Sequence, residues 1–307
     1  MILMATAVKT LITLLAIALS VGFYTLLERK VIAYMQMRKG PNKTMIIGLP
    51  QPLMDALKLF SKEIHPMKKS NKLTYALTPL MGMTVTFILW ALYTSPYSIT
   101  PMKLGILFFI AISSLNVYTL LLSGWSSNSK YAILGATRAI AQTISYEVTM
   151  ALVLTAIIIS SMTFNLMQMT IPQYLMWNTF LMPAMTMIWM ISILAETNRA
   201  PFDLAEGESE LVSGFNIEYG SGEFSFLSIA EYGSILIMSI ISSTLFLDNS
   251  LSHNPSMSVM KMLIIAYLFL WTRSTYPRMR YDMLMELTWK TFMSITITYL
   301  MVTLPFY

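Results

Sequence analysis

The chain has 307 residues, of which 56% are apolar and only 11% are charged. Soluble domains average about 25% charged residues, so this composition excludes an ordinary water-soluble domain and indicates a protein that crosses a membrane several times. The net charge of +5 is modest for the size, and the chain has no cysteine. The lack of thiols excludes disulfides, thiolate zinc sites and iron–sulfur clusters ligated by this chain.

Stretches of about 20 apolar residues, long enough to cross a bilayer as helices, recur along the chain. They predict an all-α polytopic membrane protein with a single membrane domain over residues 1–307. The eight expected spans are 2–27, 73–95, 102–123, 132–160, 175–195, 223–247, 257–272 and 284–304. Glu28-Arg29-Lys30 follows the first span without a small-residue cleavage site, which favours a retained anchor over a signal peptide.

Eight crossings place four loops on one side of the membrane: 28–72, 124–131, 196–222 and 273–283. These loops and the span ends beside them carry most of the lysines and arginines. The positive-inside rule therefore assigns this side to the matrix or cytoplasm and both termini to the opposite side. The basic first loop could also fit nucleic-acid binding, but beside eight spans topology or anionic lipid explains it better.

The first loop contains an amphipathic pattern of helical period. Its apolar face is formed by Leu53, Ala56, Leu57, Phe60 and Ile64, and its opposite face by Asp55, Lys58 and Lys62. Pro52 suits the first turn of such a helix. The pattern favours a helix lying along the membrane interface. The alternative is an ordinary amphipathic helix on a protein surface.

Glu147 lies near the middle of the fourth apolar segment. An ionisable group at this depth costs roughly 2.5 to 3.5 kcal/mol on insertion scales, which makes it a functional candidate. Arg138, Gln142 and Ser145 share the segment and could form a polar stripe with it. The alternative role is a structural hydrogen bond between helices.

The third loop is acidic and has Arg199 as its only basic residue. With its flanks it holds Glu196, Asp203, Glu206, Glu208, Glu210, Glu218, Glu223 and Glu231. A row of carboxylates leading from a loop to a mid-membrane Glu147 is what a proton relay requires. The alternative is a solvated acidic surface. The opposite charges of the first and third loops indicate that they pack together or dock a soluble partner.

Motifs for nucleotide binding, zinc proteases or redox dithiols do not occur, and His65 and His253 are isolated. We therefore expect no metal or nucleotide on this chain. Methionine is unusually frequent, with 28 residues. It is either apolar filler or the product of a genetic code that reads an isoleucine codon as methionine, which would indicate a mitochondrial genome.

The loop sequences resemble the family of subunit 1 of mitochondrial NADH:ubiquinone oxidoreductase, respiratory complex I. The matching motifs, in order and spacing along almost the whole chain, are Glu28-Arg29-Lys30, Met37 to Lys43, Gln51-Pro52 with Asp55-Ala56 and Lys58-Leu59-Phe60, Ala195 to Leu204, Glu206 to Asn216, Ala230-Glu231-Tyr232 and Tyr276 to Asp282. Two departures stand out: Thr291 to Ser294 after Trp289-Lys290, and Glu223 where a small residue or proline is common.

The resemblance implies a membrane-arm subunit of the respiratory chain, at the joint with the peripheral arm. Such a subunit helps to form the chamber that ubiquinone enters and couples quinone reduction to proton translocation. Implied partners are the iron–sulfur and quinone-site subunits of the peripheral arm, antiporter-like membrane subunits and membrane lipid. FMN and the iron–sulfur clusters would lie on partners, and the chain itself would bind no cofactor. The implied location is the mitochondrial inner membrane, with both termini in the intermembrane space.

On this basis the interfacial helix and the first and sixth spans should frame the quinone opening. Its expected quinone-binding residues are Glu28, Arg29, Arg38, Asp55 and Phe60. The expected relay consists of Asp203, Glu206, Glu208 and Glu210 in the loop, followed by Glu231, Glu196 and Glu147. A stand-alone secondary transporter would require an internal repeat, which the two halves do not show. A purely structural scaffold stays open.

Overall fold

The computed structural model describes residues 2–64, 68–93, 102–174, 176–204, 207, 214–216, 218–248 and 255–306. Within these ranges the secondary structure is helical and contains no strand, so the predicted all-α class is confirmed. Three members of the expected relay, Glu206, Glu208 and Glu210, lie outside the described residues, as do both histidines.

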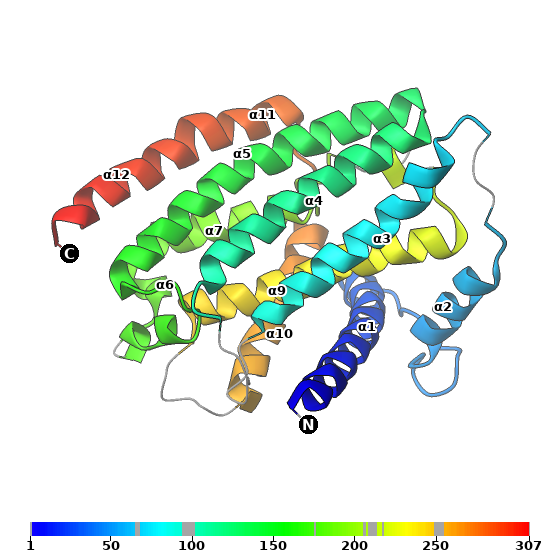
Figure 1. Ribbon diagram of the computed structural model, residues 1–307, viewed down its shortest axis with the longest axis horizontal. Coiled ribbons are helices and arrows are strands. Elements are labelled where there is room, and N and C mark those ends of the chain that lie inside the picture. Colours follow the sequence, from blue (N-terminus) through cyan, green and yellow to red (C-terminus); the bar gives the residue numbers. More distant parts are fainter. Residues whose placement is uncertain are drawn as a thin grey trace.

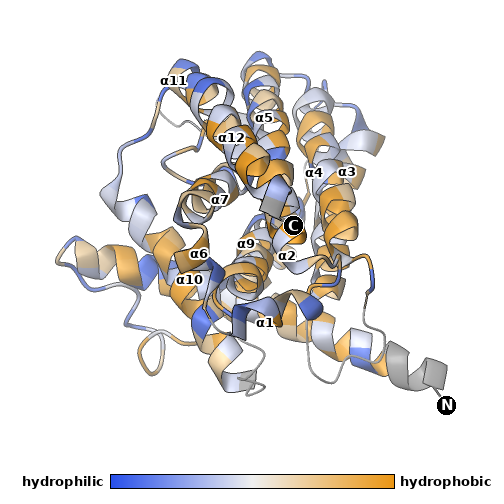
Figure 2. Cartoon of the chain, turned by 90° about the vertical axis from the view of Figure 1, so that its left-hand side faces the viewer, coloured by the Kyte–Doolittle hydropathy of each residue, from blue (hydrophilic) through white to orange (hydrophobic). Residues whose placement is uncertain are grey.

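Six of the described helices are long and apolar enough to cross a membrane. They are α1 (Ile2–Met35), α3 (Lys72–Leu89), α4 (Gly105–Ser127), α5 (Lys130–Ser161), α9 (Ser221–Phe246) and α10 (Pro255–Thr275). Each corresponds to one predicted span. Figure 2 shows hydrophobic residues along most of these helices and hydrophilic ones mainly at helix ends and in connections. A multi-pass membrane protein follows from this pattern.

The other two predicted spans are interrupted. The segment 175–195 contains α6 (Asn178–Leu181) and α7 (Pro183–Glu196), separated at Met182 because Pro183 lacks an N–H and starts a new helix. The last segment consists of α11 (Tyr281–Glu286), a π-helical turn (Leu287–Phe292) and α12 (Met293–Thr303), which form one rod in Figure 1. Eight crossings therefore stay a prediction. Short 3-10 turns complete the described structure at Trp90–Leu92, Gln168–Thr170, Pro172–Tyr174, Gly214–Asn216 and Leu304–Phe306.

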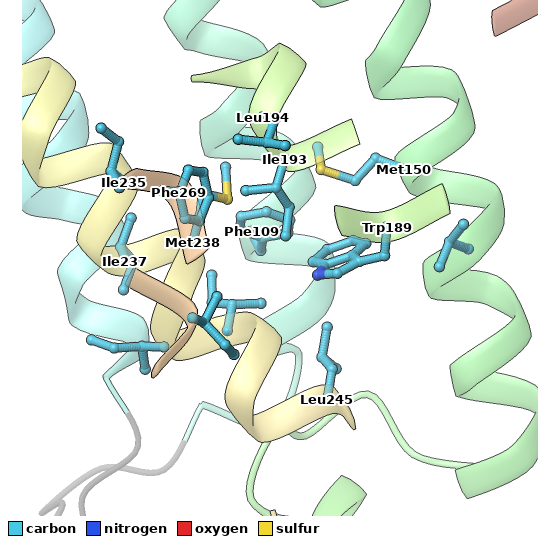
Figure 3. Close-up of a cluster of buried hydrophobic side chains, with 14 of the residues drawn as sticks. Phe109, Met150, Trp189, Ile193, Leu194, Ile235, Ile237, Met238, Leu245 and Phe269 are labelled. Atoms are coloured by element: carbon cyan, nitrogen blue, oxygen red, sulfur yellow. The ribbon is translucent and has the colours of Figure 1, made fainter. Parts of the chain in front are cut away.

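The helices pack in two layers. In Figure 1, α3, α4, α5 and the α11–α12 rod run side by side, and α9 passes behind α3. The core between the layers contains Phe109, Met150, Trp189 and Leu245, whose side chains converge in Figure 3. In the most apolar 18-residue stretch of α9, 67% of the residues are buried, whereas in that of α1 only 22% are buried. Thus α9 is the central helix, and α1 exposes most of its apolar surface.

The predicted amphipathic helix is present as α2 (Gln51–Ser61), with a proline in its first turn. It contacts α1 and α9. One face, with Pro52, Ala56 and Leu59, lines a cavity, whereas Leu53 and Leu57 are exposed. An exposed apolar face beside charged residues suits a membrane interface. The interfacial position stays a prediction.

Candidate functional site

A large cavity, with a volume of about 760 Å³, lies between α1, the loop after α1, α2 and the start of α9. All five residues expected to bind quinone line it: Glu28, Arg29, Arg38, Asp55 and Phe60. They come from three different segments, α1, the loop and α2. The structure therefore brings these residues together around one space, and their role in quinone binding stays a prediction.

The cavity has an apolar side and a polar end. Val21, Leu59 and Phe224 contribute to its apolar wall.

 
The ring of Phe60 packs against Phe226, with 5.8 Å between ring centroids. At the polar end, Nη1 of Arg29 lies 2.7 Å from Oδ2 of Asp55. A cavity with one apolar and one charged side suits a ligand with a polar head and an apolar tail.

The loop after α1 folds back on itself beside this cavity. Gly48 has a φ of +75°, and a Cβ at this position would stand 2.5 Å from the carbonyl oxygen of Pro41, so the turn requires glycine. The side chain of Lys30 donates a hydrogen bond to the carbonyl of Ile47 at 2.6 Å. These contacts fix the part of the loop that carries Arg38 at the cavity wall.

Glu28 is the buried acid of the cavity, with 5% of its surface exposed. It forms ion pairs with Arg273 at the end of α10 and with Arg199 in the loop after α7, the latter at 3.7 Å. Arg199 also lies 3.9 Å from Glu231 and 4.3 Å from the ring centroid of Tyr232. The guanidinium group of Arg199 thus connects Glu28, the acid of the large cavity, with Glu231, the acid of α9 in the expected relay.

Two smaller cavities continue from the large one. The first, of about 170 Å³, shares Tyr232 and Arg273 with the large cavity and adds Arg199 and Glu231. The second, of about 50 Å³, shares Arg199 and Glu231 with the first and reaches Glu196. Its volume is enough for about one or two water molecules, and its walls are partly polar. The three spaces therefore follow one another from the large cavity to Glu196.

Glu196 and Glu147 form the inner end of this arrangement. Glu196 ends α7 with 3% of its surface exposed, and its Oε2 has no hydrogen-bond partner among the described residues. The same holds for Oε1 of Glu147 on α5. The two carboxyl groups lie close enough to interact electrostatically. Gln142 joins α5 to this region by donating to the carbonyls of Ala195 and Phe202, at 2.9 and 2.8 Å.

The predicted polar stripe on α5 divides between two neighbours. Gln142 faces the end of α7, whereas Ser145 contacts Met285 and accepts a hydrogen bond from the indole of Trp289 at 3.3 Å. Ser145 and Glu147 are two residues apart and point to different sides of the helix. Ser145 is therefore part of the contact with the last helical rod.

Asp203, the one described loop acid of the expected relay, pairs with Arg278 at 3.3 Å. This contact joins the acidic loop to the loop after α10, where the N–H of Met279 donates to the carbonyl of Pro201 at 3.0 Å. Asp203 also interacts electrostatically with Glu231. In the described part of the chain, no group of three or more His, Asp or Glu side chains is placed to hold a metal ion.

Sequence reasoning missed Arg199, Tyr232 and Arg273 as site residues. Arg199 had a signal, because it is the only basic residue in an acidic loop. Arg273 had a weaker one as a basic residue in the last turn of an apolar helix. The partner of both, Glu28, is far away in sequence, and spacing alone does not bring them together.

Comparisons with known proteins identify the family of the chain. The family model of NADH dehydrogenase matches residues 8–304. The chain is 50% identical over 296 residues to NADH-ubiquinone oxidoreductase chain 1 of Didelphis virginiana, covering 94% of this chain and 93% of the relative. The protein of the same name from Balaenoptera physalus is 46% identical over 305 residues, with 97% and 96% covered. The resemblance noted in the loop motifs is confirmed, and the chain belongs to the NADH dehydrogenase family.

Proposed function

We propose that this chain, a core membrane subunit of NADH-ubiquinone oxidoreductase, forms a wall of the ubiquinone chamber and passes the effect of quinone reduction to buried acids. The observation that carries the proposal is the series of three cavities, which leads from Glu28 through Glu231 to Glu196. Partner subunits supply the electrons, through FMN and iron–sulfur clusters. This chain supplies the binding surface and the proton-exchanging groups.

The large cavity fits the quinone part of this role. Its volume of about 760 Å³ lies within the usual range of small-molecule sites, roughly 300 to 1,000 Å³. The Arg29–Asp55 pair and Arg38 give it a polar end for the headgroup. Its apolar wall and the exposed apolar face of α2 suit the isoprenoid tail, which arrives from the bilayer.

The relay part of the role depends on Arg199. Reduction of ubiquinone to ubiquinol consumes two electrons and two protons, so the charge and protonation near Glu28 change during turnover. Because Arg199 lies between Glu28 and Glu231, a change at one acid alters the balance of charge at the other. Glu196 and Glu147 then carry the change toward the antiporter-like subunits.

The loop acids and the membrane orientation complete the proposal. Asp203, followed in the same loop by Glu206, Glu208 and Glu210, changes protonation or shape when quinone is reduced. The four charged loops lie in the mitochondrial matrix, and both termini lie in the intermembrane space. The peripheral-arm subunits dock on the matrix side, where the basic and acidic loops offer complementary charge.

The relay is tested by Glu196→Gln and Glu147→Gln in the intact complex. We expect NADH oxidation by an artificial acceptor to persist and proton-coupled quinone reduction to fall, because glutamine keeps the shape but exchanges no proton. Glu286→Gln is the matched control, since Glu286 is exposed on α11 and pairs only locally with Lys290 at 2.6 Å. Unchanged proton pumping in both relay variants would refute the relay.

The quinone wall is tested by photoreactive ubiquinone in the same complex. Labelling of α2 near Phe60 and of the start of α9 is expected, because both line the large cavity. If the label were found only on neighbouring subunits, the scaffold alternative would replace the quinone role.

A further inference from the structure

A compact aromatic cluster closes the region between the start of α3, the end of α4 and the start of α9. The rings of Tyr75 and Tyr219 stack with 4.4 Å between centroids and 5° between planes. Leu227 of α9 belongs to the same hydrophobic cluster, and all three side chains are buried. The cluster is small and separate from the main core of the described residues.

The hydroxyl groups of the two tyrosines already have partners. The Tyr219 hydroxyl lies 2.9 Å from that of Thr78 and 3.0 Å from that of Ser126, and the Tyr75 hydroxyl donates to the carbonyl of Glu218 at 2.5 Å. Burial raises the pKa of the Tyr219 phenol above its usual value of 10.0. The ring therefore stays neutral and fixed between two helices.

The aromatic cluster lies between Glu223 and the relay acids Glu196 and Glu231. Leu227 lines the smallest cavity together with Glu196 and Glu231, and its side chain also belongs to the aromatic cluster. On the loop side of the cluster lies Glu223, which is buried and stands one turn before Leu227 on α9. An apolar layer thus stands between an acid at the loop end of α9 and the acids of the relay.

We propose that Tyr75, Tyr219 and Leu227 are a proton barrier, which closes the smallest cavity from the loop side of the membrane. The proposal rests on the relay proposed above. A row of water molecules requires polar partners, and this layer presents ring faces, an apolar side chain and hydroxyls that are already paired. Protons then reach Glu196 and Glu231 through the quinone cavity, and their movement stays tied to quinone chemistry.

The central test is Leu227→Asn in the intact complex reconstituted into liposomes. Asparagine places a polar amide in the layer and provides a partner for water. We expect electron transfer from NADH to quinone to persist, with fewer protons translocated per electron and a faster decay of the pH gradient. Leu227→Met, which keeps the apolar volume, is the matched control and should stay fully coupled.

A second variant keeps the proposal testable if the complex with Leu227→Asn does not assemble. Tyr219→Phe keeps the ring stack but removes the hydroxyl that meets Thr78 and Ser126. Because the hydroxyls of Thr78 and Ser126 then lose this partner and become available to water, a smaller loss of coupling in the same direction is expected. Assembly of each variant is checked by NADH oxidation with an artificial acceptor. Full coupling in both assembled variants would overturn the barrier.

A double variant separates failure of the barrier from failure of the relay. Glu196→Gln added to Leu227→Asn should slow the decay of the pH gradient again, because the entering proton finds no acceptor. If Glu196→Gln abolishes pumping while Leu227→Asn stays coupled, the barrier is wrong and the relay stands. If pumping persists in Glu196→Gln and Glu231→Gln, the relay itself falls.

Discussion

Helices α4 and α5 approach each other closely at Gly124, where a small change should have a measurable effect. A methyl group added there would stand 2.2 Å from Cβ of Ala136 and 3.0 Å from the carbonyl oxygen of Ala132. Carbon atoms in ordinary contact are about 3.5 to 4.0 Å apart, so the helices would have to separate by more than about 1 Å. Overpacking of this kind costs about 1 to 3 kcal/mol.

The assay is the temperature at which the intact complex loses NADH–quinone activity on heating. Gly124→Ala should lower this temperature, and Gly124→Ala combined with Ala136→Gly should recover most of it, because the second change removes the methyl group that clashes. Alanine is also a better helix former than glycine by about 1 kcal/mol. A raised temperature for Gly124→Ala would therefore mean that helix propensity dominates, and would refute the close packing of α4 and α5.

Three other predictions concern the cavity and its supports. Gly48→Ala, with its added Cβ against Pro41 at a positive φ, should displace the cavity loop and raise the KM for quinone, measured beside an unchanged rate with an artificial acceptor. Phe60→Ala loses the ring contact with Phe226 and should likewise raise KM more than it lowers kcat; equal loss of both would contradict a binding role. Gln142→Leu removes the side-chain donor of two buried carbonyls that keep only their backbone donors, at a cost of about 0.5 to 1.5 kcal/mol for each lost hydrogen bond, and should reduce the amount of assembled complex on native gels.

Local features of the fold could be predicted from the sequence. The helical spacing of apolar residues predicted α2, and the length of the apolar stretches predicted the six long helices. Both signals depend only on residues that are close in sequence. The break between α6 and α7 at Met182 was missed, although Pro183 marks it. The span was predicted from apolar composition alone, which takes no account of the backbone N–H that proline lacks.

The candidate site was predictable only in part. Family motifs grouped Glu28 with Asp55, and both line the same cavity. The cationic partners of Glu28 were missed, because its pairing with Arg199 and Arg273 depends on how α1, α10 and the loop after α7 come together. The sequence analysis also placed Ser145 and Glu147 in one polar stripe of α5. Residues two positions apart on a helix point to different sides, so the sequence already showed that these two cannot share a face.

The exposed surface of α1 has a consequence for the wall of the large cavity. This helix carries Glu28 and Arg29, yet its own chain covers only 22% of its most apolar stretch. In a bilayer such a helix is held by lipid and by neighbouring polypeptides, since it gains little from contacts within its own fold. We therefore expect the large cavity beside Glu28 to take its final shape only when adjoining proteins hold α1 in place.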